Sequence, residues 1–176
     1  MRWTYVWMGV GSLVLATTAA AQKRPIVSFP GLTAPVSLDT AGTAYRVPGS
    51  PARAYGELRR LFAAMKITVT VDDSVSGMLG TLRQTAIQRF ANSRLSDWLN
   101  CGGGMSGPLA DNARVQLAFV SMLKPAPGDS TDLRSFIVGV ATSLEGSLRD
   151  PIRCNTTGIL EVRVRDQLLK ALAAKP

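Results

Sequence analysis

The chain has 176 residues, of which 46% are hydrophobic and 18% are charged, and its formal net charge is +8. This length suits a domain with its own core, and the apolar fraction is too high for a wholly disordered protein. The sequence contains no histidine, which excludes Ser-His-Asp and Cys-His catalysis and every histidine-ligated metal site. Two cysteines are too few for a structural zinc site or an iron–sulfur cluster. We therefore expect no metal and no cofactor.

Residues 1–21 have the pattern of a secretory signal peptide. Arg2 supplies the positive charge, residues 5–16 form an apolar stretch, and Ala19 and Ala21 occupy the small-residue positions that signal peptidase needs. A membrane anchor is the alternative, but a bilayer span takes roughly 20 apolar residues. No cysteine follows the apolar stretch, which excludes the usual bacterial lipoprotein anchor. We expect cleavage after Ala21, no transmembrane span in the remaining chain, and a secreted or periplasmic protein.

Residues 22–42 are predicted to be an extended lead-in, because they hold three prolines and two glycines and show no sustained period. A strand is predicted over residues 43–47. Ser50 then predicts the N-cap and Pro51 the first residue of a helix over residues 51–66. The apolar side chains that define its inner face are Tyr55, Leu58, Leu61, Phe62 and Met65.

A hairpin and a short helix follow in the prediction. Residues 67–71 alternate strictly and are β-branched throughout, which predicts a strand. After an aspartate and serine turn, residues 78–85 return as the hairpin partner. A helix over residues 94–100 would place Trp98 and its leucine neighbours against the core.

Two long strands and a last helix complete the predicted domain. The strands cover residues 113–123 and 132–143, and a turn-rich loop separates them. In the first, Val115, Leu117 and Phe119 alternate with Arg114, Gln116 and Ala118. In the second, Phe136, Val138 and Val140 share one face. The last helix, residues 158–173, has an inner stripe of Leu160, Val164, Leu168 and Leu172.

The predicted order is therefore β-α-β-β-α-β-β-α. Short connections between neighbouring strands favour antiparallel pairing. Residues 43–176 are thus predicted to form a single α+β domain, with an antiparallel sheet and helices packed on one face.

Cys101 and Cys154 are the only cysteines. An even number in an exported chain favours pairing. A redox pair is the alternative, but that chemistry typically uses Cys-x-x-Cys spacing. We predict one structural disulfide, which would hold the end of the middle helix against the start of the last one.

The glycine-rich segment 101–107 could bind phosphate through its backbone N–H groups. It lacks the Lys-[Ser/Thr] of a P-loop, no strand directly precedes it, and Ser106 has no histidine to activate it. We interpret Gly102–Gly104 as a flexible connector, with ligand contact as the alternative. Asp72 and Asp73 point to opposite faces if they lie in a strand, so we interpret them as a solvated turn rather than paired carboxylates.

Asn155-Thr156-Thr157 matches a glycosylation sequon, and Thr157 is a candidate N-cap for the last helix. Five basic residues are candidates for an anion-binding surface, with ordinary solvated charges as the alternative: Arg59, Arg60, Arg163, Arg165 and Lys170. The aromatic residues that single-stranded nucleic-acid sites place between basic residues are missing, so we expect no nucleic-acid partner.

Residues 55–80 combine an amphipathic helix, a β-branched strand, an aspartate turn and a return strand. This run resembles the repeating modules of periplasmic envelope-assembly proteins, although it contains no diagnostic motif.

The sequence favours an exported, non-catalytic binding or structural module of a bacterial-type cell envelope, whose partner is another envelope protein. One alternative is a basic module that binds an acidic surface, such as lipid phosphate or a polyanion. A second alternative is a histidine-independent enzyme. This would require a deep pocket in which Asp72, Asp97 or Asp111 meets other polar groups.

Overall fold

The computed structural model of this chain describes residues 26–28, 35–37, 42–144 and 150–174. The predicted signal peptide lies outside these residues, as does most of the lead-in. In chain order the elements are β1 (Ile26–Val27), β2 (Val36–Ser37), β3 (Ala44–Pro48), α1 (Pro51–Ala64), β4 (Val71–Asp73), β5 (Met78–Ile87), β6 (Arg89–Phe90), β7 (Ser93–Arg94), α2 (Leu95–Trp98), β8 (Leu99–Asn100), β9 (Gly103–Gly104), β10 (Gly107–Pro108), the 3₁₀ turn η1 (Leu109–Asp111), β11 (Ala113–Ala126), β12 (Ser130–Ser143), β13 (Ile152–Thr156) and α3 (Ile159–Ala173).

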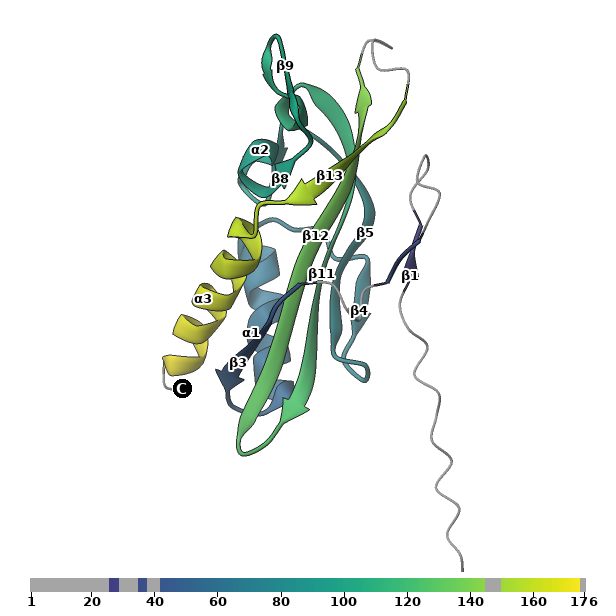
Figure 1. Ribbon diagram of the computed structural model, residues 1–176. Helices are drawn as coiled ribbons and strands as arrows, with labels where there is room; N and C mark the ends of the chain where they lie inside the picture. The colour runs from purple at the N-terminus through teal and green to yellow at the C-terminus, as the bar shows by residue number, and fades with distance from the viewer. Residues whose placement is uncertain (1–25, 29–34, 38–41, 145–149, 175–176) are drawn as a thin grey trace, which may run out of the picture.

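A seven-stranded antiparallel sheet organises these elements. Its strands lie in the order β4-β5-β11-β12-β13-β8, and β3 pairs with the end of β12 that β13 does not reach. The long strands β11 and β12 pair along their whole lengths, from Ala113 opposite Ser143 to Ala126 opposite Ser130. Figure 1 shows α1 and α3 side by side on one face of this sheet. The predicted α+β class, with helices on one face, is confirmed.

Helix α1 begins where the sequence predicts. The Ser50 hydroxyl accepts a hydrogen bond from the backbone N–H of Arg53, at 3.4 Å, and Pro51 is the first helical residue. The predicted inner face is buried, apart from the partly buried Leu61. The helix ends at Ala64, two residues before the predicted end.

The helices and the sheet enclose the main core. Phe119 of β11 stacks on Phe62 of α1, with ring centroids 5.3 Å apart, and it meets the edge of Phe90 at 6.3 Å. The four side chains predicted for the inner stripe of α3 are all buried in the same cluster. Among the described residues, no helix is long and apolar enough to cross a membrane.

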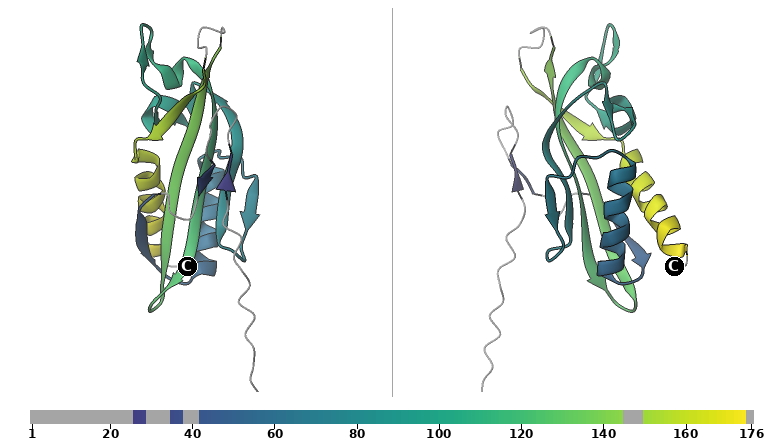
Figure 2. Two further views of the ribbon diagram at one scale, coloured as in Figure 1. Left: turned by 45° about the vertical axis from the view of Figure 1, so that its right-hand side comes forward. Right: turned by 180° about the vertical axis from the view of Figure 1, so that it is seen from behind.

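The opposite face of the sheet is apolar as well. Six buried side chains form a second cluster there, none more than 6% exposed: Ala118, Val120, Met122, Phe136, Val138 and Val140. Phe136, Val138 and Val140 do share a face, as predicted, but this is the face away from the helices. On the helix side of β12, Ile137 pairs with Phe119. The views in Figure 2 place β1 and β2 on the side of the sheet away from α1 and α3.

Several predicted boundaries are wrong. Residues 67–70 are not in a strand, and β4 comprises Val71–Asp73 instead. Arg83, with φ of 57°, lies in a bulge of β5 where the register with β11 shifts, so this strand is less regular than predicted. The middle helix is a single turn, Leu95–Trp98. β13 was not predicted, because it is only five residues long and Ile152 and Cys154 are its only apolar residues.

The last helix begins one residue later than expected. Gly158, with φ of 80°, is its N-cap, whereas Thr157 was predicted there. The Thr157 hydroxyl donates instead to the Asp97 carbonyl at 2.7 Å, and it lies 3.4 Å from the N–H of Ile159. Its contact with Asp97 therefore links α3 to α2.

Glu161, in the first turn of α3, accepts a hydrogen bond from β12 at a point where neither β3 nor β13 pairs with that strand. Between the stretches of β12 that pair with β3 and with β13, the N–H of Ile137 donates to Glu161 Oε1 at 3.3 Å. The same oxygen accepts the Thr156 hydroxyl at 2.7 Å. The carboxylate thus supplies the acceptor that a strand carbonyl would otherwise provide.

Candidate functional site

An apolar groove lies at the end of the sheet that carries the β11–β12 turn. Its volume is about 520 Å³, and its lining comes from the start of α1, the β4–β5 turn and the end of β11: Ser50, Pro51, Ala52, Tyr55, Ser74, Val75, Gly77, Leu123 and Pro125. Val75 is 98% exposed. We call this feature the Val75 groove.

The β4–β5 turn holds Val75 on the surface. Asp73 accepts hydrogen bonds from the backbone N–H groups of Val75 and Ser76, and from the Ser76 hydroxyl at 2.7 Å. The Ser76 hydroxyl, with help from the backbone bonds, lowers the pKa of Asp73 below its ordinary value. Gly77 follows with φ of 71°, and any Cβ there would collide with the Leu123 carbonyl. The turn conformation is therefore fixed.

Tyr55 forms the inner wall of the Val75 groove. Its hydroxyl donates to Asp72 Oδ1 at 2.7 Å and also lies 3.2 Å from the Met78 carbonyl. Burial, and then the hydrogen bond to the Asp72 carboxylate, raises the pKa of Tyr55. The other oxygen of Asp72 pairs with Arg59 at 3.0 Å. These partners occupy the polar groups of this wall.

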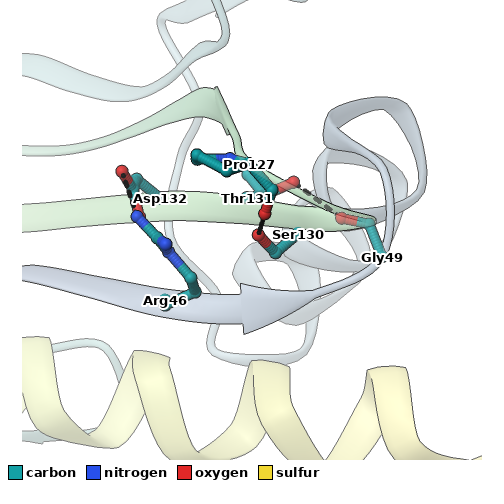
Figure 3. A network of polar contacts seen from close by, with 6 residues as sticks. All are labelled: Arg46, Gly49, Pro127, Ser130, Thr131 and Asp132. Carbon is teal, nitrogen blue, oxygen red and sulfur yellow. Dashed lines mark hydrogen bonds and ion pairs between the residues drawn. The ribbon is translucent and has the colours of Figure 1, made fainter.

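A polar network fixes the β11–β12 turn beside the groove (Figure 3). The buried Thr131 hydroxyl donates to the Gly49 carbonyl at 2.8 Å, and the Ser130 hydroxyl donates to the Pro127 carbonyl at 2.7 Å. Arg46 of β3 pairs with Asp132 of β12 at 2.9 Å. These contacts hold the start of α1 against the long strands, so the two sides of the groove keep their relative positions.

The predicted disulfide is formed. Cys101 and Cys154 are bonded, and their Cα atoms are 4.1 Å apart. The bond lies beside the pairing of β8 with β13, in which Leu99 is opposite Thr156. The end of α2 therefore meets the start of α3, which confirms the packing order predicted from the cysteines.

The five basic residues proposed as an anion-binding surface are divided between two helices, and four of them have partners within the chain. Arg59 pairs with Asp72, and Arg60 pairs with Glu57 at 2.6 Å. In α3, Arg163 stacks on Trp98 at 4.6 Å. Arg165 pairs with Asp166 at 2.7 Å and lies over the ring of Tyr45. Lys170 is exposed in the last turn of α3.

The three aspartates considered for catalysis do not meet. The Asp72 carboxylate accepts the hydroxyl of Tyr55, which lines the Val75 groove, whereas the Asp111 carboxylate accepts the N–H and hydroxyl of Ser96, at 2.9 and 2.6 Å. Asp97 is exposed, and its carbonyl accepts from Thr157. As predicted, Asp72 and Asp73 point to different surroundings. Within the described ranges, no three Asp, Glu, Cys or His side chains are grouped to hold a metal ion.

The glycine-rich segment forms a small hairpin in which Gly104 is opposite Gly107, with Met105 fully exposed at the tip. The Asn155 sequon lies partly within β13. Sequence reasoning did not find the Val75 groove. The available signal was a valine placed between turn-forming residues, where no core position is expected.

No protein-family model matches this chain, and no curated protein is significantly similar to it.

Proposed function

We propose that this chain is an exported, non-catalytic binding module of a bacterial-type cell envelope. In this proposal the Val75 groove takes an apolar segment of another envelope protein. The signal-peptide pattern of residues 1–21 and the Cys101–Cys154 disulfide support export, because disulfides persist in oxidising compartments. The groove itself is the observation that carries the binding role.

The chemistry of the groove favours an apolar occupant. The hydroxyl of Tyr55, the carboxylate of Asp73 and the N–H of Val75 already have partners within the chain. A polar ligand would have to displace these hydrogen bonds. An apolar side chain would instead cover Val75, Pro51 and Pro125, and covering apolar surface is favourable at roughly 25 cal/mol per Å².

A binding role is favoured over a catalytic one for two reasons. The chain contains no histidine, and among the candidate aspartates Asp72 bonds Tyr55 at one end of the sheet, whereas Asp111 bonds Ser96, next to Asp97, at the other. A general acid or base would need to lie within hydrogen-bond reach of one reacting group together with its other catalytic partners. This supports the proposal that the module has no enzymatic activity.

The alternative proposal is binding to an acidic surface, such as lipid phosphate or a polyanion. The net charge of +8 favours it. The ion pairs of Arg59, Arg60 and Arg165 disfavour a site at those residues, because their charges are already partly neutralised. Salt separates the two proposals, since charge-driven binding weakens with ionic strength and apolar binding does not.

Site-specific crosslinking tests the proposed partner site. A photo-crosslinking residue would replace Val75 in the exported chain, and a matched one would replace Met105, another fully exposed apolar residue in a hairpin turn. We expect a discrete protein adduct in the envelope from position 75 only, with a yield that added salt does not lower.

Two variants complete this test. An excess of unlabelled natural protein should compete for the partner and lower the yield of this adduct. Unlabelled Val75→Glu should no longer compete, whereas unlabelled Met105→Glu should compete as well as the natural sequence. Equal adducts from both positions would refute the groove as the partner site. A salt-sensitive adduct with lipid or polyanion alone would overturn the proposal in favour of the acidic-surface alternative.

A further inference from the structure

A second, polar cleft lies near the other end of the sheet, where β11 begins. Its volume is about 320 Å³. The β6–β7 hairpin supplies one wall with Arg89 and Arg94. The glycine-rich hairpin and the residues after it supply the other wall, with Ser106, Pro108, Asp111 and Asn112. We call this feature the Arg89–Arg94 cleft.

The two arginines lie directly opposite each other in the β6–β7 pair. Like charges in this position repel. Arg89 donates one N–H to the Asn92 carbonyl at 3.1 Å, and within the described residues neither arginine has an ion pair. Since each guanidinium carries five N–H donors, most donors of this pair are free to bind a ligand.

Among the described residues of the cleft, the one acidic side chain is already engaged. Asp111 lines the wall opposite the arginines, but its two oxygens accept the N–H and the hydroxyl of Ser96. Its negative charge offsets one of the two arginine charges formally, which leaves the cleft with a net positive charge. An incoming anion therefore meets an attractive potential and unoccupied donors.

The wall that presents the arginines is anchored in the core. Phe90, the residue after Arg89, is buried against the ring of Phe119, and its carbonyl accepts the indole N–H of Trp98 at 2.8 Å. The N–H of Leu95 donates to the Gln88 carbonyl at 2.9 Å, which closes the base of the hairpin. The arginine backbones are thus fixed before a ligand arrives, so binding orders only the side chains.

The facing wall is fixed by one amide. Asn112 Nδ2 donates to the Ser106 carbonyl at 3.2 Å and to the Pro108 carbonyl at 3.0 Å. The N–H of Leu109 donates to the Gly102 carbonyl at 2.9 Å. These bonds place the glycine-rich hairpin across from the arginines, so that both walls face the same volume.

We propose that the Arg89–Arg94 cleft binds a phosphate group, either free or carried on a lipid headgroup. Two guanidinium groups offer planar forks that match phosphate oxygens, and a tetrahedral phosphate has enough oxygens to accept from both. This site is separate from the Val75 groove, and the inference does not rest on the function proposed for that groove.

Binding of phosphate to the full, disulfide-bonded chain tests this inference. Inorganic phosphate and glycerol 3-phosphate would be titrated by calorimetry, and vesicles with and without phosphatidic acid would be tested by co-sedimentation. We expect Arg89→Gln and Arg94→Gln each to weaken phosphate binding about tenfold, because each removes charge-assisted hydrogen bonds. Both side chains are exposed, so both variants should keep the melting temperature of the natural sequence.

The cleft variant combines Arg89→Gln with Arg94→Gln. Its matched control combines Arg60→Gln with Arg153→Gln, which removes the same charge from exposed positions outside the cleft. It should bind phosphate within about twofold of the natural sequence. Arg94→Lys keeps the charge and should restore part of the binding. Binding to phosphatidic acid vesicles that follows the same variants would assign the lipid source, and binding to soluble phosphates alone would assign the free one.

Three results would overturn the inference. One is the absence of phosphate binding by the natural sequence. The second is an equal loss in the cleft variant and the control variant, which would show a general charge effect. The third is succinate binding as tight as phosphate binding, which would assign the cleft to carboxylates.

Discussion

The two ends of the sheet use the same long strands, β11 and β12, but present opposite chemistry. At the Val75 groove, the carboxylates of Asp72 and Asp73 and the hydroxyl of Tyr55 are all hydrogen-bonded, and an apolar side chain is left exposed. At the Arg89–Arg94 cleft, the nearby carboxylate is taken by a serine, and two arginines keep free donors. The first end therefore suits an apolar partner, and the second suits an anion.

This difference shows how little the net charge alone says about binding. Arg59 and Arg60 lie in a conspicuous basic pair in the sequence, yet Asp72 and Glu57 neutralise them. Arg89 and Arg94 are less conspicuous, but the hairpin brings them together without an ion pair in the described part of the chain. The arrangement of acidic partners decides which arginines can attract a ligand.

The largest effect should come from the residue that anchors the cleft. Trp98 is fully buried and its indole N–H donates to the Phe90 carbonyl. Trp98→Ala should lower the free energy of unfolding by about 3–5 kcal/mol, as expected for a large aromatic removed from a core. Urea denaturation followed by circular dichroism measures this.

Trp98→Phe serves as the control, because it keeps an aromatic ring and loses the hydrogen bond. It should be clearly less destabilising than Trp98→Ala. Under conditions in which the Trp98→Ala variant remains folded, its phosphate binding should be weaker, while its crosslinking at position 75 should persist. Equal loss of both would show that the two ends are not independent.

The disulfide should have the next largest effect. The double variant Cys101→Ser, Cys154→Ser should lose about 2–4 kcal/mol of stability, because the bond closes a loop with a sequence separation of 53. The melting temperature should fall, while far-UV circular dichroism should remain close to that of the natural sequence. Reactive free thiols in the native protein would contradict the bond itself.

The fold was largely predictable because its main signals are local. Ser50 and Pro51 mark a helix start, and the spacing of Tyr55, Leu58 and Phe62 marks its buried face. β13 could not be predicted in the same way. It is short and lies between β12 and the two-residue strand β8, where its pairing with these strands and the disulfide at Cys154 fix it rather than its own pattern.

The candidate sites were less predictable than the fold. Alternation in β12 identified one buried face, but not that this face lies away from the helices, because a period of two does not say which side is covered. The Arg89–Arg94 pair depends on a two-residue turn at Ala91 and Asn92, both with positive φ. Alanine is rare in that conformation, so the sequence gives no hint of the hairpin.

Tyr55 should show a smaller effect at the groove end. Tyr55→Phe removes a hydrogen bond to a carboxylate and should cost about 1.5 kcal/mol at neutral pH. Because the folded state raises the pKa of Tyr55, its contribution is full below the ordinary tyrosine pKa of about 10 and is lost as pH rises through the folded value. The variant should therefore lose less stability than the natural sequence above pH 10.

Denaturation of both proteins across this alkaline range is the measurement. Trp98→Phe is a suitable comparison, since it also removes one polar contact of an aromatic residue but no titrating group. An alkaline loss that is identical in the natural sequence and in Tyr55→Phe would mean that other groups account for it.

Asp73 should have the smallest effect on stability and a clear effect on recognition. Hydrogen bonds from Ser76, and then from Val75, lower its folded pKa, so its contribution is present above the ordinary aspartate pKa of about 4 and is lost as pH falls through the folded value. Asp73→Ala should change the melting temperature little at pH 7 and should flatten the acid limb of the stability curve.

Since Asp73 also fixes the turn that presents Val75, the variant should lower the yield of the position-75 crosslink. Ser76→Ala keeps the two backbone bonds and should lower the yield less. An unchanged crosslink in Asp73→Ala would mean that the partner does not depend on the conformation of this turn.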